Sequence, residues 1–338
     1  FIGGYVGTSG KPALVENVHV EGEISGGSNI GGFAGQSREG TFKNCTSKVK
    51  IISGGTDVGG FIGKTAVSTH LENCTAEVDL TPTEAVSGNL RYAGIVGYTT
   101  GNTMKVINCS AKGTITSGEK SVRTAGGIVG YAGAGECEVS NCLSDVSILG
   151  GNVSNAGGIC GVASCATSLL IQNCCSNGEF TVYQVNAGIL SKHEKGVAQI
   201  KNCYSTIKID GYSGLGGLVG QGVAGLEITM TNCFAWNPSI TATRDAADKY
   251  SSGAIAASVS GKNTFTGNFR NPALVLTDPF RTIQNHEDLA AATPEGDANQ
   301  HAFDGKPAAE SATVSSLAKA AGWDETVWDL SGNLPKLK

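Results

Sequence analysis

Apolar and polar residues alternate along most of this chain in short runs that recur about every thirty residues. Residues 45–51, for example, read Cys-Thr-Ser-Lys-Val-Lys-Ile, with small or apolar side chains at every second position. A period of two is typical of a β-strand with one buried face. Another apolar residue, Phe42, lies three positions before Cys45, and this odd spacing breaks the alternation. We therefore predict a corner at Asn44, because asparagine tolerates a left-handed backbone better than other non-glycine residues.

Two short motifs mark the repeats and alternate along the chain. The first is Asn-Cys, whose cysteines are Cys45, Cys74, Cys109, Cys142, Cys174, Cys203 and Cys233. The second is a glycine pair followed by two apolar residues, and its clearest copies begin at Gly3, Gly31, Gly59, Gly126, Gly157 and Gly216. Glycine within a strand is typical of a bend or of a close approach between backbones. Each repeat is thus expected to contain three short strands.

Three short strands per repeat, stacked in parallel register, describe one coil of a β-solenoid. Stacking at about 4.8 Å buries the inner face of each coil and pairs its backbone groups. The sequence therefore predicts an all-β fold, a parallel β-helix of about eight coils over residues 1–262. A twisted sandwich of hairpins would need two-residue turns, which are not evident.

From about Asn263 the repeat fails, and residues 263–338 are expected to form a C-terminal cap. A cap is needed because an open solenoid end exposes unpaired strand edges and apolar core. We expect short helices at 286–292 and 311–321 and a final strand. Residue 1 falls just before a glycine motif, so a signal sequence is expected upstream of this chain.

Outward-facing charges support this register. Three positions after successive cysteines or their equivalents stand Glu21, Lys48, Glu77, Lys112 and Asp145. In a parallel stack these side chains are direct neighbours, and opposite charges stabilise such pairs by ~0.2–1 kcal/mol each. The alternation in sign from coil to coil is therefore what an in-register stack requires.

Composition excludes several classes of protein. The chain has 49 glycines, 40% hydrophobic residues and only 16% charged residues, so it has ample material for a core and is not expected to be disordered. A formal net charge of -5 gives no reason to expect a nucleic-acid partner. No apolar run approaches the ~20 residues needed to span a bilayer.

The glycine motif resembles the GLUG motif, as in the sequence Gly-Gly-Leu-Val-Gly at 216–220 and Gly-Gly-Ile-Val-Gly at 126–130. Its pairing with Asn-Cys-x-Ser/Ala is similar as well, and the resemblance covers about residues 3–262. GLUG repeats occur in large bacterial surface proteins, including non-catalytic parts of some immunoglobulin-A-protease-like proteins. The resemblance implies a right-handed β-solenoid, secreted or held at the cell surface, and it brings no catalytic residues with it.

We therefore expect a non-enzymatic bacterial module for adhesion or surface display, with a host or matrix protein or a glycan as partner. A carbohydrate-active enzyme, a polysaccharide lyase or hydrolase, is the alternative, and an intracellular scaffolding repeat is a weaker one. Interleaved lysines argue against clustered catalytic carboxylates. The five histidines are scattered along the sequence, at His19, His70, His193, His286 and His301. No cofactor or metal site is predicted.

Eleven cysteines require an interpretation of their redox state. Seven fill the inward column of the repeat and are expected to be reduced, buried thiols. Outside that column, Cys160 is expected to be buried, whereas Cys175 should point outward and Cys165 should lie in a loop. Those two are the candidates for a reactive or disulfide-bridged pair, and the state of Cys137 stays open. The glycosylation-like triplets that begin at Asn44, Asn73 and Asn108 are interpreted as part of a structural asparagine ladder.

One outward column gathers aromatic residues in the late coils. Tyr204 and Phe234 directly follow their cysteines, and Trp236 lies on the same face as Phe234. Exposed aromatic side chains bind sugars or proteins by stacking and burial. We predict a binding surface at Tyr204, Phe234 and Trp236, and the alternative is that the C-terminal segment packs over these rings.

Overall fold

The chain is described by a computed structural model that covers residues 3–7, 10–83, 89–117, 122–223, 225–245, 250–286 and 302–338. Strands account for 61% of it and helix for 2%, arranged as a parallel β-solenoid of about eight turns. The predicted all-β solenoid is therefore confirmed. In the described part no helix is long and apolar enough to cross a membrane.

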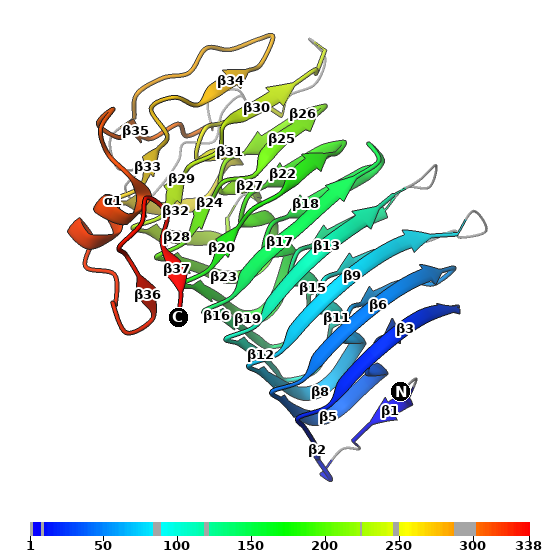
Figure 1. Ribbon diagram of the computed structural model, residues 1–338. Helices are drawn as coiled ribbons and strands as arrows, with labels where there is room; N and C mark the ends of the chain where they lie inside the picture. Colours follow the sequence, from blue (N-terminus) through cyan, green and yellow to red (C-terminus); the bar gives the residue numbers. More distant parts are fainter. Residues whose placement is uncertain are drawn as a thin grey trace.

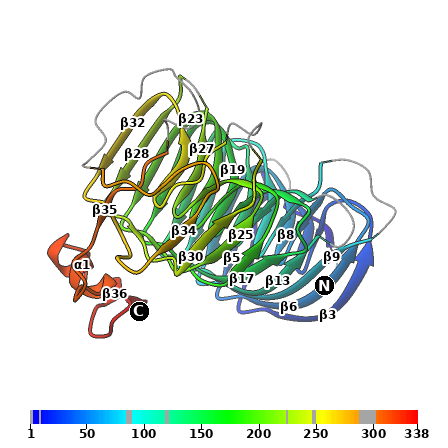
Figure 2. The ribbon, with the colours of Figure 1, turned by 90° about the horizontal axis from the view of Figure 1, so that it is seen from above.

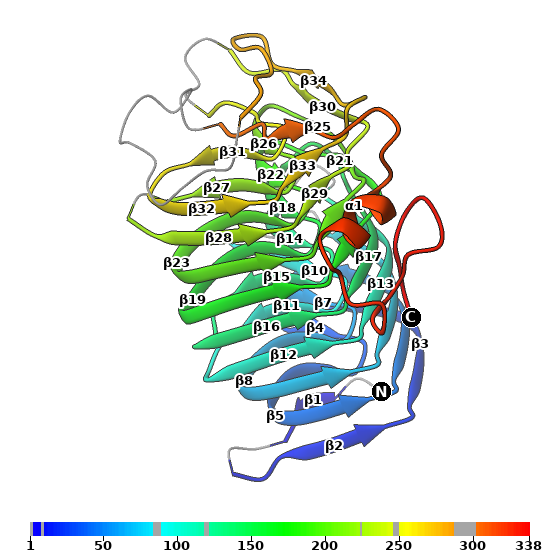
Figure 3. The same cartoon turned by 90° about the vertical axis from the view of Figure 1, so that its left-hand side faces the viewer.

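Each coil passes through three parallel sheets in turn (Figures 1 and 2). The first sheet carries the strands that precede the asparagine corners (Figure 3): β1 (Gly3–Val6), β2 (Ala13–Glu16), β5 (Ala34–Lys43), β8 (Ile62–Glu72), β11 (Val96–Thr99), β12 (Thr103–Ile107), β15 (Val129–Ala132), β16 (Glu136–Ser140), β19 (Cys160–Gln172), β23 (Leu190–Lys201), β27 (Val219–Gly222), β28 (Glu227–Thr231), β31 (Ala256–Val259) and β32 (Lys262–Thr266).

The second sheet follows the asparagine corners. Its strands are β3 (His19–Gly26), β6 (Thr46–Ser53), β9 (Thr75–Pro82), β13 (Ser110–Thr116), β17 (Leu143–Leu149), β20 (Cys175–Ser176), β21 (Glu179–Thr181), β24 (Tyr204–Ser205), β25 (Lys208–Gly211), β29 (Phe234–Ala235), β30 (Ser239–Ala242), β33 (Phe269–Arg270), β34 (Val275–Thr277) and β35 (Lys306–Pro307).

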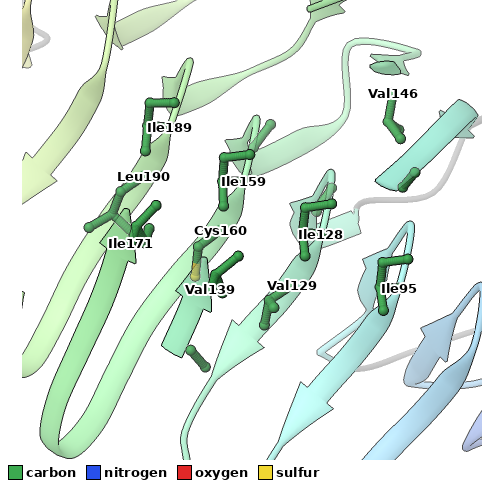
Figure 4. Close-up of a cluster of buried hydrophobic side chains, with 14 of the residues drawn as sticks. Ile95, Ile128, Val129, Val139, Val146, Ile159, Cys160, Ile171, Ile189 and Leu190 are labelled. Atoms are coloured by element: carbon green, nitrogen blue, oxygen red, sulfur yellow. The ribbon is translucent and has the colours of Figure 1, made fainter. Parts of the chain in front are cut away.

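The third sheet leads into the glycine pairs. Its strands are β4 (Ile30–Gly31), β7 (Asp57–Gly59), β10 (Arg91–Ala93), β14 (Val122–Gly126), β18 (Val153–Gly157), β22 (Gln184–Ala187) and β26 (Ser213–Gly216). The apolar core lies between the three sheets. Figure 4 shows Ile95, Ile128, Ile159 and Ile189 at equivalent positions of successive coils, and all four are fully buried.

The predicted asparagine corner is confirmed. The asparagines at the described corners adopt the left-handed conformation, with φ between 51° and 55°: Asn17, Asn44, Asn73, Asn108, Asn141, Asn173, Asn202 and Asn232. The side chains from Asn17 to Asn202 form a ladder, because each amide nitrogen after the first donates to the amide oxygen of the preceding coil. The Nδ2–Oδ1 distance is 3.1 Å from Asn108 to Asn73 and 2.9 Å from Asn141 to Asn108.

The cysteine that follows each corner points inward, as predicted. All seven column cysteines are buried and free. Each thiol donates to the carbonyl oxygen two residues earlier, at 3.1 Å from Cys45 to Lys43 and 3.2 Å from Cys142 to Ser140. The side chain thus satisfies a backbone acceptor at the corner while filling the core with a small apolar atom.

Close contact between the glycine pair and the second sheet explains why serine or alanine follows Asn-Cys-x. A Cβ atom at Gly127 would lie 1.9 Å from Ser144 Oγ and 2.1 Å from the Gly158 carbonyl oxygen. Ser176 uses the same proximity to donate from Oγ to the Gly188 carbonyl oxygen at 2.5 Å. Only glycine on one side and a small residue on the other fit this distance.

Parallel stacking continues past residue 262, where the repeat was expected to end. Strand β32 pairs with β28, β33 with β29, β34 with β30, and β35 with β33. In this last coil the corner residue is Gly267, at φ 67°, and the buried Asn268 stands in the cysteine position. Asn268 satisfies its amide with the Met230 carbonyl oxygen and the Cys233 N–H, so the fold tolerates loss of the motif.

Two buried ion pairs fasten the segment that closes this end of the solenoid. Arg244 Nε donates to Asp278 at 2.8 Å, and Arg281 pairs with Asp304. The Asp304 carboxylate also accepts the Ala254 N–H at 2.8 Å. Each carboxylate therefore has several donors, which a buried charge requires.

Residues 308–338 form a small unit of one helix and one hairpin, and from here on we call this unit the cap. Helix α1 (Val314–Ala320) lies within the predicted 311–321 segment and is N-capped by Thr313. Strand β36 (Trp328–Asp329) pairs antiparallel with the last strand, β37 (Lys336–Leu337). The helix expected at 286–292 falls outside the described residues from 287 onward.

The asparagine ladder leads to a stability prediction. Asn108→Ala should lower the free energy of unfolding by about 1–3 kcal/mol, because alanine disfavours the left-handed backbone and removes two ladder hydrogen bonds. Asn108→Gly should lower it less, since glycine accepts that backbone without strain. Urea unfolding followed by circular dichroism measures both changes. Equal losses in the two variants would contradict a role for the left-handed corner.

Candidate functional site

The predicted binding surface at Tyr204, Phe234 and Trp236 is covered by the cap. Tyr204 is 3% exposed and Phe234 is 1% exposed, while Trp236 is half-buried against the same apolar cluster. The Phe234 ring stacks on Trp323 with centroids 5.3 Å apart. Tyr204 Oη donates to the Pro335 carbonyl oxygen at 2.7 Å. The rings of Tyr204 and Phe234 are therefore covered by the cap, which was the alternative to ligand binding, whereas Trp236 stays partly exposed.

Sequence alone left ligand binding and cap docking open because both need a row of aromatic side chains on an outer face. The deciding partners, Trp323 and Trp328, lie about ninety residues or more beyond Phe234 in a segment without repeats. The cap docks on the side of the second sheet (Figures 1 and 3). Asn232 Nδ2 also turns to this cap and donates to the Ala321 carbonyl oxygen at 3.5 Å.

Two cysteine expectations also need correction. Cys175 leaves the solenoid core but is buried in the apolar cluster beneath the cap. Cys165 is fully buried within strand β19, with its thiol facing the Ala132 carbonyl oxygen, rather than in a loop. Neither thiol is exposed to solvent, and Cys137 is buried too.

The second sheet is uncovered in its earlier coils, and this part is the strongest remaining candidate for a site. We call the outward side of β3, β6, β9, β13 and β17 the open face. Beside the asparagine corners it carries small hydroxyl residues in register: Thr46, Thr75 and Ser110. In later coils the same column changes to Leu143, Cys175, Tyr204 and Phe234, the residues that meet the cap.

The predicted charge row lies next to the hydroxyl column. Strand pairing places Glu21, Lys48, Glu77, Lys112 and Asp145 side by side. Lys48 Nζ lies 3.5 Å from Glu21 and 3.9 Å from Glu77, and Lys112 Nζ lies 2.9 Å from Glu77. The hydrogen bond from Lys112 lowers the pKa of the exposed Glu77 carboxyl. Lys48 and Lys112 therefore compensate Glu21 and Glu77, whereas Asp145 accepts a hydrogen bond from Asn177 Nδ2 at 2.6 Å.

Two adjoining hollows lie along the open face. One, which we call the cap cleft, has a volume of about 490 Å³ and separates the asparagine corners from the cap hairpin. Asn73, Asn108, Asn141 and Ser110 line one side, and Val327 and Leu337 line the other. The second hollow, about 530 Å³, spans the hydroxyl column and the charge row. Ser110 and Leu143 line both hollows, so the two hollows adjoin along the open face, and we call them together the groove.

One group of polar side chains on the open face was not predicted from the sequence: His19 lies between a hydroxyl and a carboxylate. His19 Nδ1 is hydrogen-bonded to Thr46 Oγ1, and His19 Nε2 lies 3.6 Å from Glu21 Oε2. The contact with Thr46 could have been predicted from the repeat, since His19 and Thr46 occupy the same position of successive coils. The histidine and glutamate side chains are 60% and 58% exposed. Solvent thus surrounds this hydroxyl, imidazole and carboxylate, whereas nucleophilic catalysis works best in a water-excluded site.

The other described histidines lie apart from one another. His193 is buried with Nε2 near the Lys195 carbonyl oxygen, and His286 Nδ1 accepts the Asp304 N–H at 3.0 Å. Burial lowers the pKa of both imidazoles. His301 is outside the described residues. Across the described ranges, no group of three or more His, Cys, Asp or Glu side chains is placed to hold a metal ion.

Comparison with known proteins identifies a likeness of fold. No family model matches the sequence, and no curated protein matches it. The chain is similar to the crystal structure of a protein described as a putative immunoglobulin A1 protease from Bacteroides ovatus. The two share 19% sequence identity with a TM-score of 0.52, and the match covers 98% of this chain and 94% of the other. At this identity the likeness concerns architecture alone.

The rate at which a thiol reagent labels Cys175 measures how firmly the cap is docked, because the cap buries this residue. Burial raises the pKa of the Cys175 thiol to about 12, so little of it is the reactive thiolate at pH 8. Trp328→Ala removes a fully buried cap side chain and should accelerate labelling of Cys175 by at least about tenfold. Leu334→Ala, at an exposed cap position, is the matched control. Peptide mapping by mass spectrometry measures the rates.

Labelling of Cys175 in the unaltered protein as fast as in urea would contradict this arrangement. Cys109, in the inward column, should stay unlabelled in both variants, because the solenoid core does not depend on the cap at that coil.

Proposed function

We propose that this chain is a non-enzymatic binding module of a secreted or surface-held bacterial protein, used in adhesion or display. The observation that carries the proposal is the groove on the open face, made of two adjoining hollows. It lies on a scaffold held by parallel strand pairing, where side chains are presented at fixed spacing. Extended repeat scaffolds typically use such a surface for binding.

The GLUG-like repeat supports the same proposal, because that resemblance implies surface display. The similar structure is named as a putative protease, and its fold alone gives this chain no activity. A module of this kind would present its groove to a host or matrix protein or to a glycan. The paired lysines and glutamates of the charge row favour a partner that is not strongly charged.

A carbohydrate-active enzyme on this scaffold would need a carboxyl group that is both protonated and accessible. Burial raises the pKa of Asp57, but that carboxylate is hydrogen-bonded to Arg91 Nε at 2.6 Å and is only 4% exposed. The accessible Glu77 has its pKa lowered by Lys112. Neither residue suits a general acid, and this favours binding over hydrolysis.

A combined binding and turnover assay tests the proposal. The purified chain is immobilised and exposed to panels of glycans and matrix proteins, and the same ligands are analysed for cleavage products. We expect retention of at least one ligand class without cleavage. Turnover that is lost in His19→Ala or Glu77→Gln, with the fold intact by circular dichroism, would identify an enzyme instead. Absence of retention across both panels would also refute the proposal.

A further inference from the structure

The asparagine ladder has hydrogen-bonding capacity beyond what the fold uses. A side-chain amide has two N–H donors and an oxygen with two lone pairs. In the ladder, Asn73 and Asn108 each use one donor and one lone pair toward their neighbours. Each amide therefore retains one donor and one acceptor. Asn73 and Asn108 are exposed, and both line the cap cleft.

Each uncovered coil adds a hydroxyl group beside its amide. Thr75 and Ser110 stand two residues after Asn73 and Asn108, in register with each other. The corner geometry requires the asparagine, but it does not require the hydroxyl, because the same column holds Leu143 and aromatic residues under the cap. Amide and hydroxyl thus form one neutral polar rung per coil on the open face.

The spacing of these rungs decides between polymeric partners. Successive coils repeat at about 4.8 Å, whereas an extended peptide presents side chains to the same side only every ~6.7 Å, twice its rise per residue. A peptide therefore falls out of step within two rungs. A β-1,4-linked chain of six-membered sugar rings is an extended ribbon whose advance per sugar is close to the coil spacing. Successive rings are flipped, but each ring carries hydroxyl groups on both of its edges, so a hydroxyl-bearing edge recurs at every sugar. One sugar can then meet each rung.

We propose that the cap cleft and the adjoining hydroxyl column bind a neutral, β-1,4-linked polysaccharide laid along the solenoid axis. This inference rests on the proposed binding function and assigns its ligand class and its site. Sugar hydroxyls bond to the free amide and hydroxyl groups of the rungs. Val327 and Leu337, on the cap side of the cleft, contact the apolar C–H faces of a sugar at the end of the track.

The extent of the track follows from the exposed rungs. Asn44 with Thr46 forms the first of them, and Asn141 lies at the cap, so the bound segment is about four sugars long. In the neighbouring charge row, Lys48 and Lys112 are paired with Glu21 and Glu77, and Asp145 accepts a hydrogen bond from Asn177. A neutral chain leaves these contacts in place, whereas an anionic polysaccharide would have to displace Glu77 from Lys112.

Isothermal titration with β-1,4-linked oligosaccharides tests this site. The probes are gluco-, xylo-, manno- and N-acetylglucosamine oligomers of two to six sugars, with α-1,4-linked maltohexaose as a chain of the wrong shape. We expect at least one β-1,4 series to bind, with affinity rising up to about four sugars and then levelling. Maltohexaose should bind at least tenfold more weakly.

Substitutions at the rungs locate the site. Ser110→Phe should weaken binding at least tenfold, because the ring fills the cleft, and an aromatic residue already occupies this column at Phe234. Thr75→Phe tests the next rung in the same way. Thr114→Phe, further along the same strand, β13, is the control and should leave affinity unchanged. Thermal unfolding confirms that each variant is folded.

The outcomes separate this inference from the proposed function. No binding by any β-1,4 series, equal affinity for maltohexaose, or full affinity in both folded rung variants would overturn the assigned ligand or site. If the panels still identify a protein or another glycan as ligand without turnover, the proposed binding function stands while this inference fails. If nothing is retained in either assay, both are refuted.

Discussion

The left-handed asparagine corner is the constraint on which the rest of this structure depends. It turns the chain so that the cysteine directly after the asparagine points into the core and the residue after that cysteine faces outward. It also sets the register, because each amide bonds to the amide of the preceding coil. With register fixed, opposite charges, small residues and glycines fall beside their counterparts. The hydrophobic interior and the surface pattern are both consequences of one backbone conformation repeated at each turn.

Features that repeat could be predicted from the sequence, since several copies report the same local geometry. The corner, the inward cysteines and the alternating charge row all belong to this class. Features that occur once have no second copy that reports the same geometry. The corner of the last coil is formed by Gly267, which has the left-handed backbone that asparagine adopts in the other coils, and Asn268 takes the cysteine position. A single degenerate copy does not show which residue turns.

The same distinction applies to the candidate site. The rows of hydroxyl and charged residues on the open face follow from the register. The cap cleft does not, because its second side comes from Val327 and Leu337, which belong to no repeat. The docking position of the cap depends on how Trp323 and Trp328 pack against the rings of Tyr204 and Phe234, which are distant in sequence. That contact has no periodic signal, so the aromatic column was equally compatible with a ligand platform.

Lateral docking of the cap has a mechanical consequence. The apolar cluster beneath it joins Cys175, Tyr204 and Phe234, which belong to three successive coils, and it also reaches Leu143 and Phe269. The cap therefore acts as a clamp across several turns, and tension would load these turns as one unit. Earlier coils are held by nearest-neighbour contacts and would peel apart one at a time. Under tension we therefore expect the coils beneath the cap to resist together, and the earlier coils to separate stepwise and dissipate force.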